Sequence, residues 1–275
     1  MRAPTARQRA VAAVGGRYLM APPLALAHRG GAGYRLNAGI ENSLRAVAHA
    51  VDLGYAYVET DVRASADGVP FVFHDADLAR VVGASTDLRA LTAREIRSAS
   101  LVGGESIPTL RELLEEFPGT RFNVDVKSDD VVAPTLDLLE ELGAFDRVLI
   151  AAFSHRRLQW VRRAAPHAAT SASPLEAAAL RFGRAAARSL AARNGAVCLQ
   201  VPISHRGRRI VTADLVSAAH SYGLQVHVWT IDDVPTITEL LDLGVDGIIS
   251  DRIDVLRDVL LARGQWPAGG DAEHR

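Results

Sequence analysis

The chain has 275 residues, of which 48% are hydrophobic and 23% are charged, and its formal net charge is −1 at pH 7. A chain of this length and composition can bury a large core, which excludes an intrinsically disordered protein. The near-zero charge gives no long-range attraction to nucleic acid or to an anionic membrane, although a local basic pocket for one phosphate remains compatible with it.

The single cysteine, Cys198, can form no intrachain disulfide and cannot by itself build a zinc or iron–sulfur site. Because it lies in an apolar run, we interpret it as a small buried hydrophobe. Arginines at positions 2, 7, 9 and 17 interrupt the apolar stretches of the first twenty residues. A signal peptide needs about 7–15 uninterrupted apolar residues and a membrane span about 20. We therefore expect neither, and we expect a cytoplasmic protein.

From Leu24 onward, short apolar runs alternate with amphipathic segments. The runs predict strands at Leu24–His28, Tyr57–Arg63, Arg121–Lys127, Arg147–Phe153, Ala168–Ser171, Ala196–Val201, Leu224–Thr230 and Asp246–Ser250. The amphipathic segments predict helices at Ser43–Leu53, Thr109–Phe117, Val131–Leu142, Ser154–Ala165, Pro174–Ala192, Thr212–Tyr222, Asp233–Leu243 and Ile253–Ala262. Strands that alternate with helices in this way indicate βαβ units and a parallel sheet.

One polar segment interrupts this alternation. After the second strand, Val69–His74 predicts a further extended run, and residues 75–107 are more polar, with a short helix near Thr92–Ser98. Eight βα units in a chain of this size predict a (β/α)8 TIM barrel, here with a small insertion after the second strand. A doubly wound open sheet is the alternative, but no Gly-x-Gly-x-x-Gly turn follows the first strand. We place an N-terminal extension at 1–23, the barrel at 24–262 and a tail at 263–275.

Ionisable residues gather at the carboxyl ends of the predicted strands, where a barrel has its active face. The first strand ends in His28 and Arg29, the second in Glu59 and Asp61, the extended run in His74, and the third strand in Asp125 and Lys127. Glu59 and Asp61 are two residues apart, so they lie on the same side of a strand.

Like charges this close repel, and a hard divalent cation relieves the repulsion by accepting carboxylate oxygens. By spacing alone, a pair of surface carboxylates is equally compatible with this motif. Asp125, at the end of the next strand, favours a metal site for Mg²⁺ or Ca²⁺ rather than zinc, which prefers sulfur and nitrogen ligands. The two histidines titrate near physiological pH, and Arg29 and Lys127 supply fixed positive charge for a phosphoryl group.

Two aromatic side chains on the seventh predicted strand leave alternatives open. His227 and Trp229 share one face of that strand with Gln225. Trp229 would form a wall of the pocket, although plain barrel packing explains both residues equally well.

Eight short motifs resemble the glycerophosphodiester phosphodiesterases, in that family's order. They are "AHRG" at 27–30, "EN" at 41–42, "ETDV" at 59–62, "HD" at 74–75, "IPTL" at 107–110, "VDVK" at 124–127, "VWT" at 228–230 and "GVDGIISD" at 244–251. The resemblance covers about Leu24–Leu260, and the family also has a small insertion after "HD".

The resemblance implies a TIM barrel that hydrolyses glycerophosphodiesters to an alcohol and sn-glycerol 3-phosphate with Mg²⁺ or Ca²⁺. It implies His28 and His74 as general acid and base and Arg29 and Lys127 as phosphate-binding residues. The metal ligands would be Glu59, Asp61 and Asp125, with Glu41 beside the metal as a ligand or as an acceptor behind it.

The sequence departs from the family pattern at three places. Asp125 stands where Glu is usual, Ile40 replaces a Pro, and Thr-Ile-Asp-Asp at 230–233 carries Asp where Asn is more usual. Sphingomyelinase D-type relatives also have Asp at the third ligand, so phospholipase D-like cleavage of lysophospholipids or sphingolipids is an alternative. A barrel that only binds phosphorylated polyols is a further one. The expected partner is a small phosphodiester, with no nucleic acid and no integral membrane segment.

Overall fold

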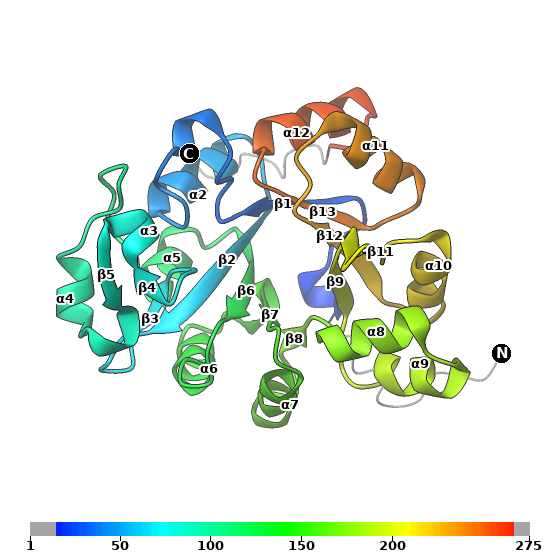
Figure 1. Ribbon diagram of the computed structural model, residues 1–275, viewed down its shortest axis with the longest axis horizontal. Coiled ribbons are helices and arrows are strands. Elements are labelled where there is room, and N and C mark those ends of the chain that lie inside the picture. Colours follow the sequence, from blue (N-terminus) through cyan, green and yellow to red (C-terminus); the bar gives the residue numbers. More distant parts are fainter. Residues whose placement is uncertain (1–14, 267–275) are drawn as a thin grey trace.

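The computed structural model describes residues 15–266, so most of the predicted N-terminal extension and of the tail lie outside the described residues. Eight parallel strands form the barrel (Figure 1). They are β1 (Leu24–His28), β2 (Tyr57–Ala64), β6 (Arg121–Val126), β7 (Val148–Ala151), β8 (Ala169–Thr170), β9 (Cys198–Pro202), β12 (Gln225–Trp229) and β13 (Gly247–Ser250).

The strand order is β8-β7-β6-β2-β1-β13-β12-β9. The ring closes between β8 and β9, where a parallel bridge joins Ser171 to Cys198 and the Ala172 N–H donates to the Cys198 carbonyl over 2.7 Å. The predicted TIM barrel is therefore confirmed, and the open-sheet alternative is wrong.

Helices surround the strands (Figure 1). They are α2 (Leu44–Asp52), α5 (Leu110–Glu116), α6 (Val132–Glu141), α7 (His155–Ala164), α8 (Pro174–Phe182), α9 (Ala185–Ala192), α10 (Ala213–Ser221), α11 (Val234–Asp242) and α12 (Ile253–Ala262). Most of them begin at a Ser, Thr or Asp whose side chain accepts a backbone N–H of the first turn, which satisfies a donor that the helix itself leaves free.

The single helix predicted over Pro174–Ala192 is wrong. At Gly183 the chain leaves the helix with φ −76° and ψ 159°, and α9 begins after Arg184. A Cβ at Gly183 would lie 2.3 Å from the Ala179 carbonyl oxygen, so this close turn requires glycine. The alanine-rich composition on both sides hides the break from a periodicity argument.

The insertion after β2 has its own small core. It contains β3 (Pro70–Val72), which pairs antiparallel with β2, then β4 (Asp77–Leu78), α3 (Ala79–Val82), β5 (Ala84–Asp87), η2 (Leu88–Ala90) and α4 (Ala93–Arg97). Its buried side chains are Phe71, Phe73, Leu78, Leu88, Ile96, Leu101 and Ile107. Figure 1 shows this unit at one side of the barrel, beside the end of β2.

The amino-terminal end of the barrel is closed by the segment that precedes β1. The Tyr57 hydroxyl donates to the Tyr18 carbonyl over 2.7 Å and accepts the Met20 N–H over 2.8 Å. Cys198 is fully buried beside Tyr18, as predicted. No helix within residues 15–266 is long and apolar enough to cross a membrane.

Candidate active site

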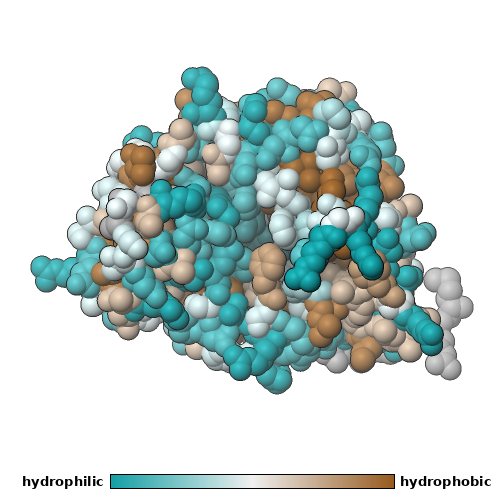
Figure 2. All heavy atoms as spheres, in the orientation of Figure 1, coloured by the Kyte–Doolittle hydropathy of each residue, from teal (hydrophilic) through white to brown (hydrophobic). Residues whose placement is uncertain are grey.

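A cavity of about 200 Å³ opens at the carboxyl ends of the strands. It is lined by eight of the nine residues predicted from the sequence, namely His28, Arg29, Glu59, Asp61, His74, Asp125, Lys127 and Trp229. Figure 2 shows a hollow near the centre of this face, with mostly hydrophilic residues on its left side. The ninth residue, Glu41, is outside the lining and contacts Arg29.

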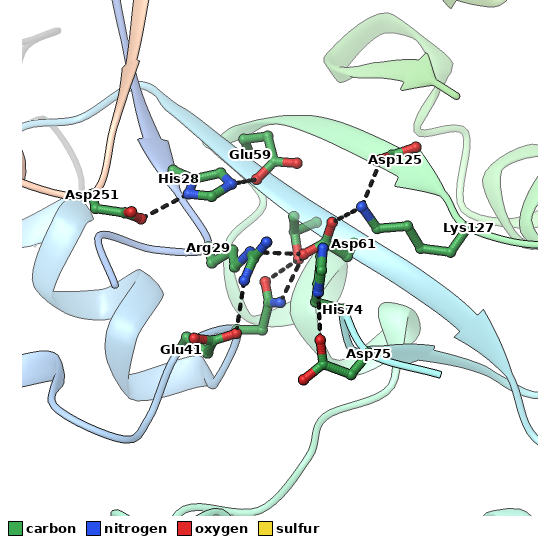
Figure 3. A network of polar contacts seen from close by, with 12 residues as sticks. His28, Arg29, Glu41, Glu59, Asp61, His74, Asp75, Asp125, Lys127 and Asp251 are labelled. Carbon is green, nitrogen blue, oxygen red and sulfur yellow. Dashed lines mark hydrogen bonds and ion pairs between the residues drawn. The ribbon is translucent and has the colours of Figure 1, made fainter. Parts of the chain in front are cut away.

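Strand register brings the charged residues together. His28 on β1 lies opposite Glu59 on β2, and Asp61 lies opposite Asp125 on β6. Because alternate residues of a strand point to the same side, Glu59 and Asp61 both face the cavity (Figure 3). The E-x-D spacing thus places both carboxylates on one side of the strand, as predicted.

Lys127 lies between two of the carboxylates. Its Nζ is 2.6 Å from Asp61 Oδ1 and 2.7 Å from Asp125 Oδ2 (Figure 3). Burial opposes the charged form of Asp61, but Lys127 and then Arg29 outweigh it and lower the pKa of this carboxyl. Asp61 Oδ2 also lies 3.2 Å from Arg29 Nε and accepts from the Asn42 side-chain amide over 3.1 Å.

The other two carboxylates are held less firmly in the charged form. Burial and then the neighbouring Asp61 raise the pKa of Glu59 to about 7. Burial also raises the pKa of Asp125, which Lys127 offsets only in part. Both side chains are more than nine-tenths buried, so extra positive charge in the cavity would stabilise them.

Three buried oxygen acceptors that face the cavity have no hydrogen-bond partner among the described residues. They are Glu59 Oε2, Asn123 Oδ1 and Asp125 Oδ1. Unpaired buried acceptors are rare in folded proteins, and oxygens of this type are the preferred ligands of Mg²⁺ and Ca²⁺. As placed, no three His, Cys, Asp or Glu side chains within residues 15–266 have the spacing of a metal cluster. The donor chemistry fits a hard cation, whereas the present arrangement places the Lys127 ammonium between Asp61 and Asp125.

Asn123 was not identified from the sequence. It lies opposite Glu59 in the register and two residues before Asp125 on β6, so it shares the cavity face of that strand. The same alternation that linked Glu59 to Asp61 would have identified it.

Each cavity histidine has its own carboxylate partner (Figure 3). His28 Nδ1 is 2.7 Å from Asp251 Oδ1, and His74 Nδ1 is 2.6 Å from Asp75 Oδ1. His28 Nε2 lies 3.6 Å from Glu59 Oε2. Burial opposes the protonated form of His28, but Glu59 and the hydrogen bond to Asp251 outweigh it and raise its pKa.

Neither Asp75 nor Asp251 had been assigned a role from the sequence, although both belong to the matching motifs. Asp75 directly follows His74, and Asp251 follows the end of the last strand. A carboxylate that accepts from one imidazole nitrogen fixes the tautomer and leaves the other nitrogen to exchange a proton. Both histidines thus have the arrangement of a general acid or base.

Glu41 belongs to a network that extends from the cavity to the insertion. It accepts from Arg29 Nη1 over 3.0 Å and from the forked guanidinium of Arg80 over 2.9 and 2.6 Å. Arg80 Nε also donates to Asp75 over 2.6 Å. Burial opposes the charged form of Glu41, but Arg80 and Arg29 together lower its pKa. Glu41 therefore acts on the cavity through Arg29 in this structure.

The loop after β1 depends on backbone conformations that favour glycine. Arg29, Gly30 and Gly31 have φ values of 51°, 80° and 92°. A Cβ at Gly30 would lie 2.9 Å from the backbone carbon of Ala46, so α2 can pack this closely only against glycine. The turn directs Arg29 back toward Asp61.

One side of the cavity is apolar. Trp229 packs edge-on against Phe153, with ring centroids 5.8 Å apart, and Phe153 is 64% exposed. His227 does not reach the cavity. It is buried against Gln225 and Gln200, and burial lowers its pKa to about 4. The packing interpretation therefore holds for His227, while Trp229 lies in the wall of the cavity.

Comparisons with known proteins agree with this geometry. The model of the glycerophosphoryl diester phosphodiesterase family matches residues 28–255. The chain is 42% identical over 248 residues to the Mycobacterium tuberculosis protein named "Probable glycerophosphodiester phosphodiesterase 2", covering 88% of this chain and 92% of that one.

Solved structures share the fold. A phosphodiesterase of Oleispira antarctica, in complex with the product sn-glycerol-3-phosphate, has a TM-score of 0.73 at 23% identity and covers 87% of this chain and 97% of its own. A glycerophosphodiester phosphodiesterase of Parabacteroides distasonis has a TM-score of 0.73 at 22% identity, with 90% and 100% covered. Since the family model spans most of the chain and the M. tuberculosis relative matches nearly end to end, this chain belongs to the glycerophosphoryl diester phosphodiesterase family, a family of enzymes.

Proposed function

We propose that this enzyme hydrolyses glycerophosphodiesters to an alcohol and sn-glycerol 3-phosphate, with one divalent cation and with His28 and His74 as general acid and base. The main support for this proposal is the set of side chains that line one cavity. Two histidines, each paired with its own aspartate, face three buried carboxylates and two fixed cations. Binding alone would not require an acid–base pair, so the polyol-binding alternative is not supported.

Glu59, Asp61 and Asp125 would hold the cation, with Asn123 as a further oxygen donor. The unpaired oxygens of Glu59, Asn123 and Asp125 support this set, as does the absence of any sulfur donor in the cavity lining. Mg²⁺ or Ca²⁺ bound there would neutralise charge on the diester and polarise phosphorus toward attack.

Arg29 and Lys127 would bind the phosphate. Both are cations beside Asp61 at the cavity wall, and the Arg29 guanidinium can form two parallel hydrogen bonds to phosphate oxygens. Their charge would stabilise the additional negative charge that develops in the transition state. Trp229 would contact the carbon skeleton of the substrate.

The two histidines would transfer protons on opposite sides of the phosphorus. One would deprotonate the nucleophile, for which the 2-hydroxyl of the substrate's own glycerol is suitably close, and this attack would give a cyclic phosphodiester. The other would protonate the departing alkoxide, and their roles would reverse when water opens the ring. Asp251 and Asp75 support these roles because they fix the orientation of His28 and His74.

Cleavage of lysophospholipids by a phospholipase D-like reaction is a second candidate. The observation that favours it is the apolar rim, where Phe153 is 64% and Leu175 is 63% exposed near the cavity residues Pro174 and Trp229. An acyl chain could lie along such a surface.

The test follows release of glycerol 3-phosphate from glycerophosphoglycerol and glycerophosphocholine, and release of choline and lysophosphatidic acid from lysophosphatidylcholine, each with and without EDTA. We expect hydrolysis of the water-soluble diesters that EDTA abolishes and that Mg²⁺ or Ca²⁺ restores. Turnover that survives chelation would contradict the metal requirement, and cleavage of the lysolipid alone would favour the second candidate. The His28→Ala variant should lose most turnover while keeping the wild-type melting temperature.

A further inference from the structure

A short basic hairpin stands beside the cavity and takes no part in the chemistry described above. It consists of β10 (Ser204–His205) and β11 (Arg208–Arg209). Residues 204–209 contain three arginines, one histidine and no acidic residue, and all six are exposed. For a chain with a net charge of −1, this is a marked local concentration of positive charge.

The hairpin is a defined structure rather than a loose loop. Ser204 pairs with Arg209 and His205 with Arg208. The two central residues, Arg206 and Gly207, have φ values of 49° and 74°, as a type I′ turn requires. At its base, the Ile210 N–H donates to the Ile203 carbonyl over 2.9 Å.

Two arginines of the hairpin are free to bind a ligand. Arg209 is engaged, because its guanidinium donates to the Val211 carbonyl and pairs with Glu239. In the part of the chain that the structure describes, the side chains of Arg206 and Arg208 form neither an ion pair nor a hydrogen bond. The hairpin therefore presents two uncompensated charges to solvent.

The hairpin lies next to the rim of the cavity in which the substrate would bind. Pro202, at the end of β9, lies opposite Trp229 in the register, and Trp229 and Gln200 both line the cavity. The hairpin starts two residues after Pro202, so it rises from the cavity rim on the Trp229 side. In Figure 2, strongly hydrophilic side chains project at the place that β10 and β11 occupy in Figure 1, beside the hollow.

The size of the cavity determines what reaches the hairpin. At about 200 Å³ it is smaller than the roughly 300–1,000 Å³ of pockets that enclose a drug-sized ligand. A glycerophosphate group bound to Arg29 and Lys127 would fill much of it, so a larger leaving alcohol would extend past the rim.

We propose that the β10–β11 hairpin is a binding site for a second anionic group on the leaving alcohol, so that the preferred substrates carry a further phosphate beyond the diester that is cleaved. This inference rests on the proposed function. Two arginines on a rigid turn would attract the distal phosphate and orient it, and Arg206 and Arg208 would make charge-assisted hydrogen bonds to its oxygens. An alcohol that is neutral or cationic would gain nothing from this surface.

The test compares two soluble substrates that release the same glycerol 3-phosphate. One is glycerophosphoglycerol, whose alcohol is neutral, and the other is 1,3-bis(glycerophospho)glycerol, whose alcohol carries a second phosphodiester. The variant is Arg206→Asn/Arg208→Gln, since asparagine before Gly207 suits a type I′ turn and should preserve the hairpin. Arg206→Lys/Arg208→Lys retains the charge and serves as the rescue variant.

A matched control removes two arginines from the opposite face. Arg163 lies in the last turn of α7 and Arg193 at the carboxyl end of α9, and both are exposed. Barrel helices run antiparallel to the strands, so these ends lie away from the cavity. Arg163→Gln/Arg193→Gln changes the net charge by the same amount.

For the hairpin variant we expect kcat/KM toward the bis-phosphodiester to fall about fivefold to tenfold through KM, as loss of two exposed charge pairs implies. The fall should shrink at about 1 M salt, where the Debye length is roughly 3 Å. Activity toward glycerophosphoglycerol should not change, the lysine variant should retain most of the preference, and the control should behave as wild type.

Equal effects on both substrates, or none on either, would overturn the inference. So would hairpin-dependent sedimentation with phosphatidylglycerol vesicles without any change toward the soluble bis-phosphodiester, which would indicate a membrane-docking surface instead. If the wild-type enzyme cleaves neither glycerophosphoglycerol nor the bis-phosphodiester, the proposed function itself fails, and the two failures are thereby distinguished.

Discussion

Asp251 Oδ1 lies 2.7 Å from Nδ1 of His28, although 223 residues separate the two in the sequence. The contact exists because β13 pairs with β1, which places the residues after Ser250 beside the end of the first strand. Asp232 fixes this turn, since its carboxylate accepts the backbone N–H groups of Asp251 and Arg252 and the Ser250 hydroxyl. The orientation of His28 thus depends on the last strand of the barrel.

Replacing Asp251 by asparagine should therefore impair catalysis without unfolding the protein. We expect kcat/KM to fall at least about tenfold, as is common when the partner of an active-site histidine is removed. Because Asp251 favours the protonated imidazole, its loss should also lower the pKa of His28. The limb of the pH–rate profile that belongs to His28 should then move to lower pH. Asp254→Asn, which removes a partly exposed carboxylate paired with Arg252, is the control and should leave the pH–rate profile unchanged.

Arg80 should matter for turnover although it belongs to the insertion. It holds both Asp75, the partner of His74, and Glu41, the partner of Arg29. We expect Arg80→Ala to lower kcat/KM roughly tenfold. Arg80→Lys should restore little of this activity, because an ammonium group cannot hydrogen-bond to both carboxylates in the way that the planar guanidinium does. Arg89→Ala is the matched control, since Arg89 is an exposed arginine of the same insertion whose only ion-pair partner among the described residues is Asp87. If both alanine variants keep full activity, the network is incidental.

Metal binding should be measurable apart from turnover. Mg²⁺ or Ca²⁺ that binds the folded state should raise the melting temperature in proportion to RT ln(1 + [M]/Kd), and EDTA should reverse the shift. Removing one charged oxygen ligand with Asp125→Asn should raise the metal concentration needed for a given shift by roughly tenfold to a hundredfold. Asp129→Asn, a change two residues beyond Lys127 at a partly exposed carboxylate, is the control. If the melting temperature of the wild-type enzyme does not change when Mg²⁺ or Ca²⁺ is added, the proposed metal site is contradicted.

His227 predicts a specific dependence of stability on pH. Burial lowers its pKa to about 4, whereas the unfolded chain has a value near 6.5. As the pH falls below about 6.5, His227 becomes protonated in the unfolded state but stays neutral in the folded state. The free energy of unfolding therefore decreases until the pH nears 4. The full difference corresponds to about 3 kcal/mol.

Urea denaturation between pH 7 and pH 4 measures this effect. His227→Gln should flatten the curve in that range, even though the substitution lowers stability at pH 7 by disturbing a packed site. His167→Gln, at an exposed histidine, should leave the slope as in wild type. If the free energy of unfolding of His227→Gln depends on pH as steeply as that of the wild type, the His227 imidazole is not the cause of the pH dependence.

The sequence by itself determined the (β/α)8 architecture and the ionisable residues that line the cavity. Both follow from local rules: apolar periodicity distinguishes strands from helices, and alternation on a strand fixes which side Glu59 and Asp61 share. Parallel strands of a barrel all end at one face, so ionisable residues at strand ends could be assigned to one site before any contact was known.

Only the tertiary structure decided which of these groups contact one another. The pairing of Asp251 with His28, the Lys127 bridge between Asp61 and Asp125, and the reach of Arg80 from the insertion all depend on strand register and on loop paths. Such contacts join residues distant in the chain, and no local periodicity encodes them. The break at Gly183 is decided in the same way, because it depends on how closely the backbone approaches the Ala179 carbonyl rather than on the helical propensity of its neighbours.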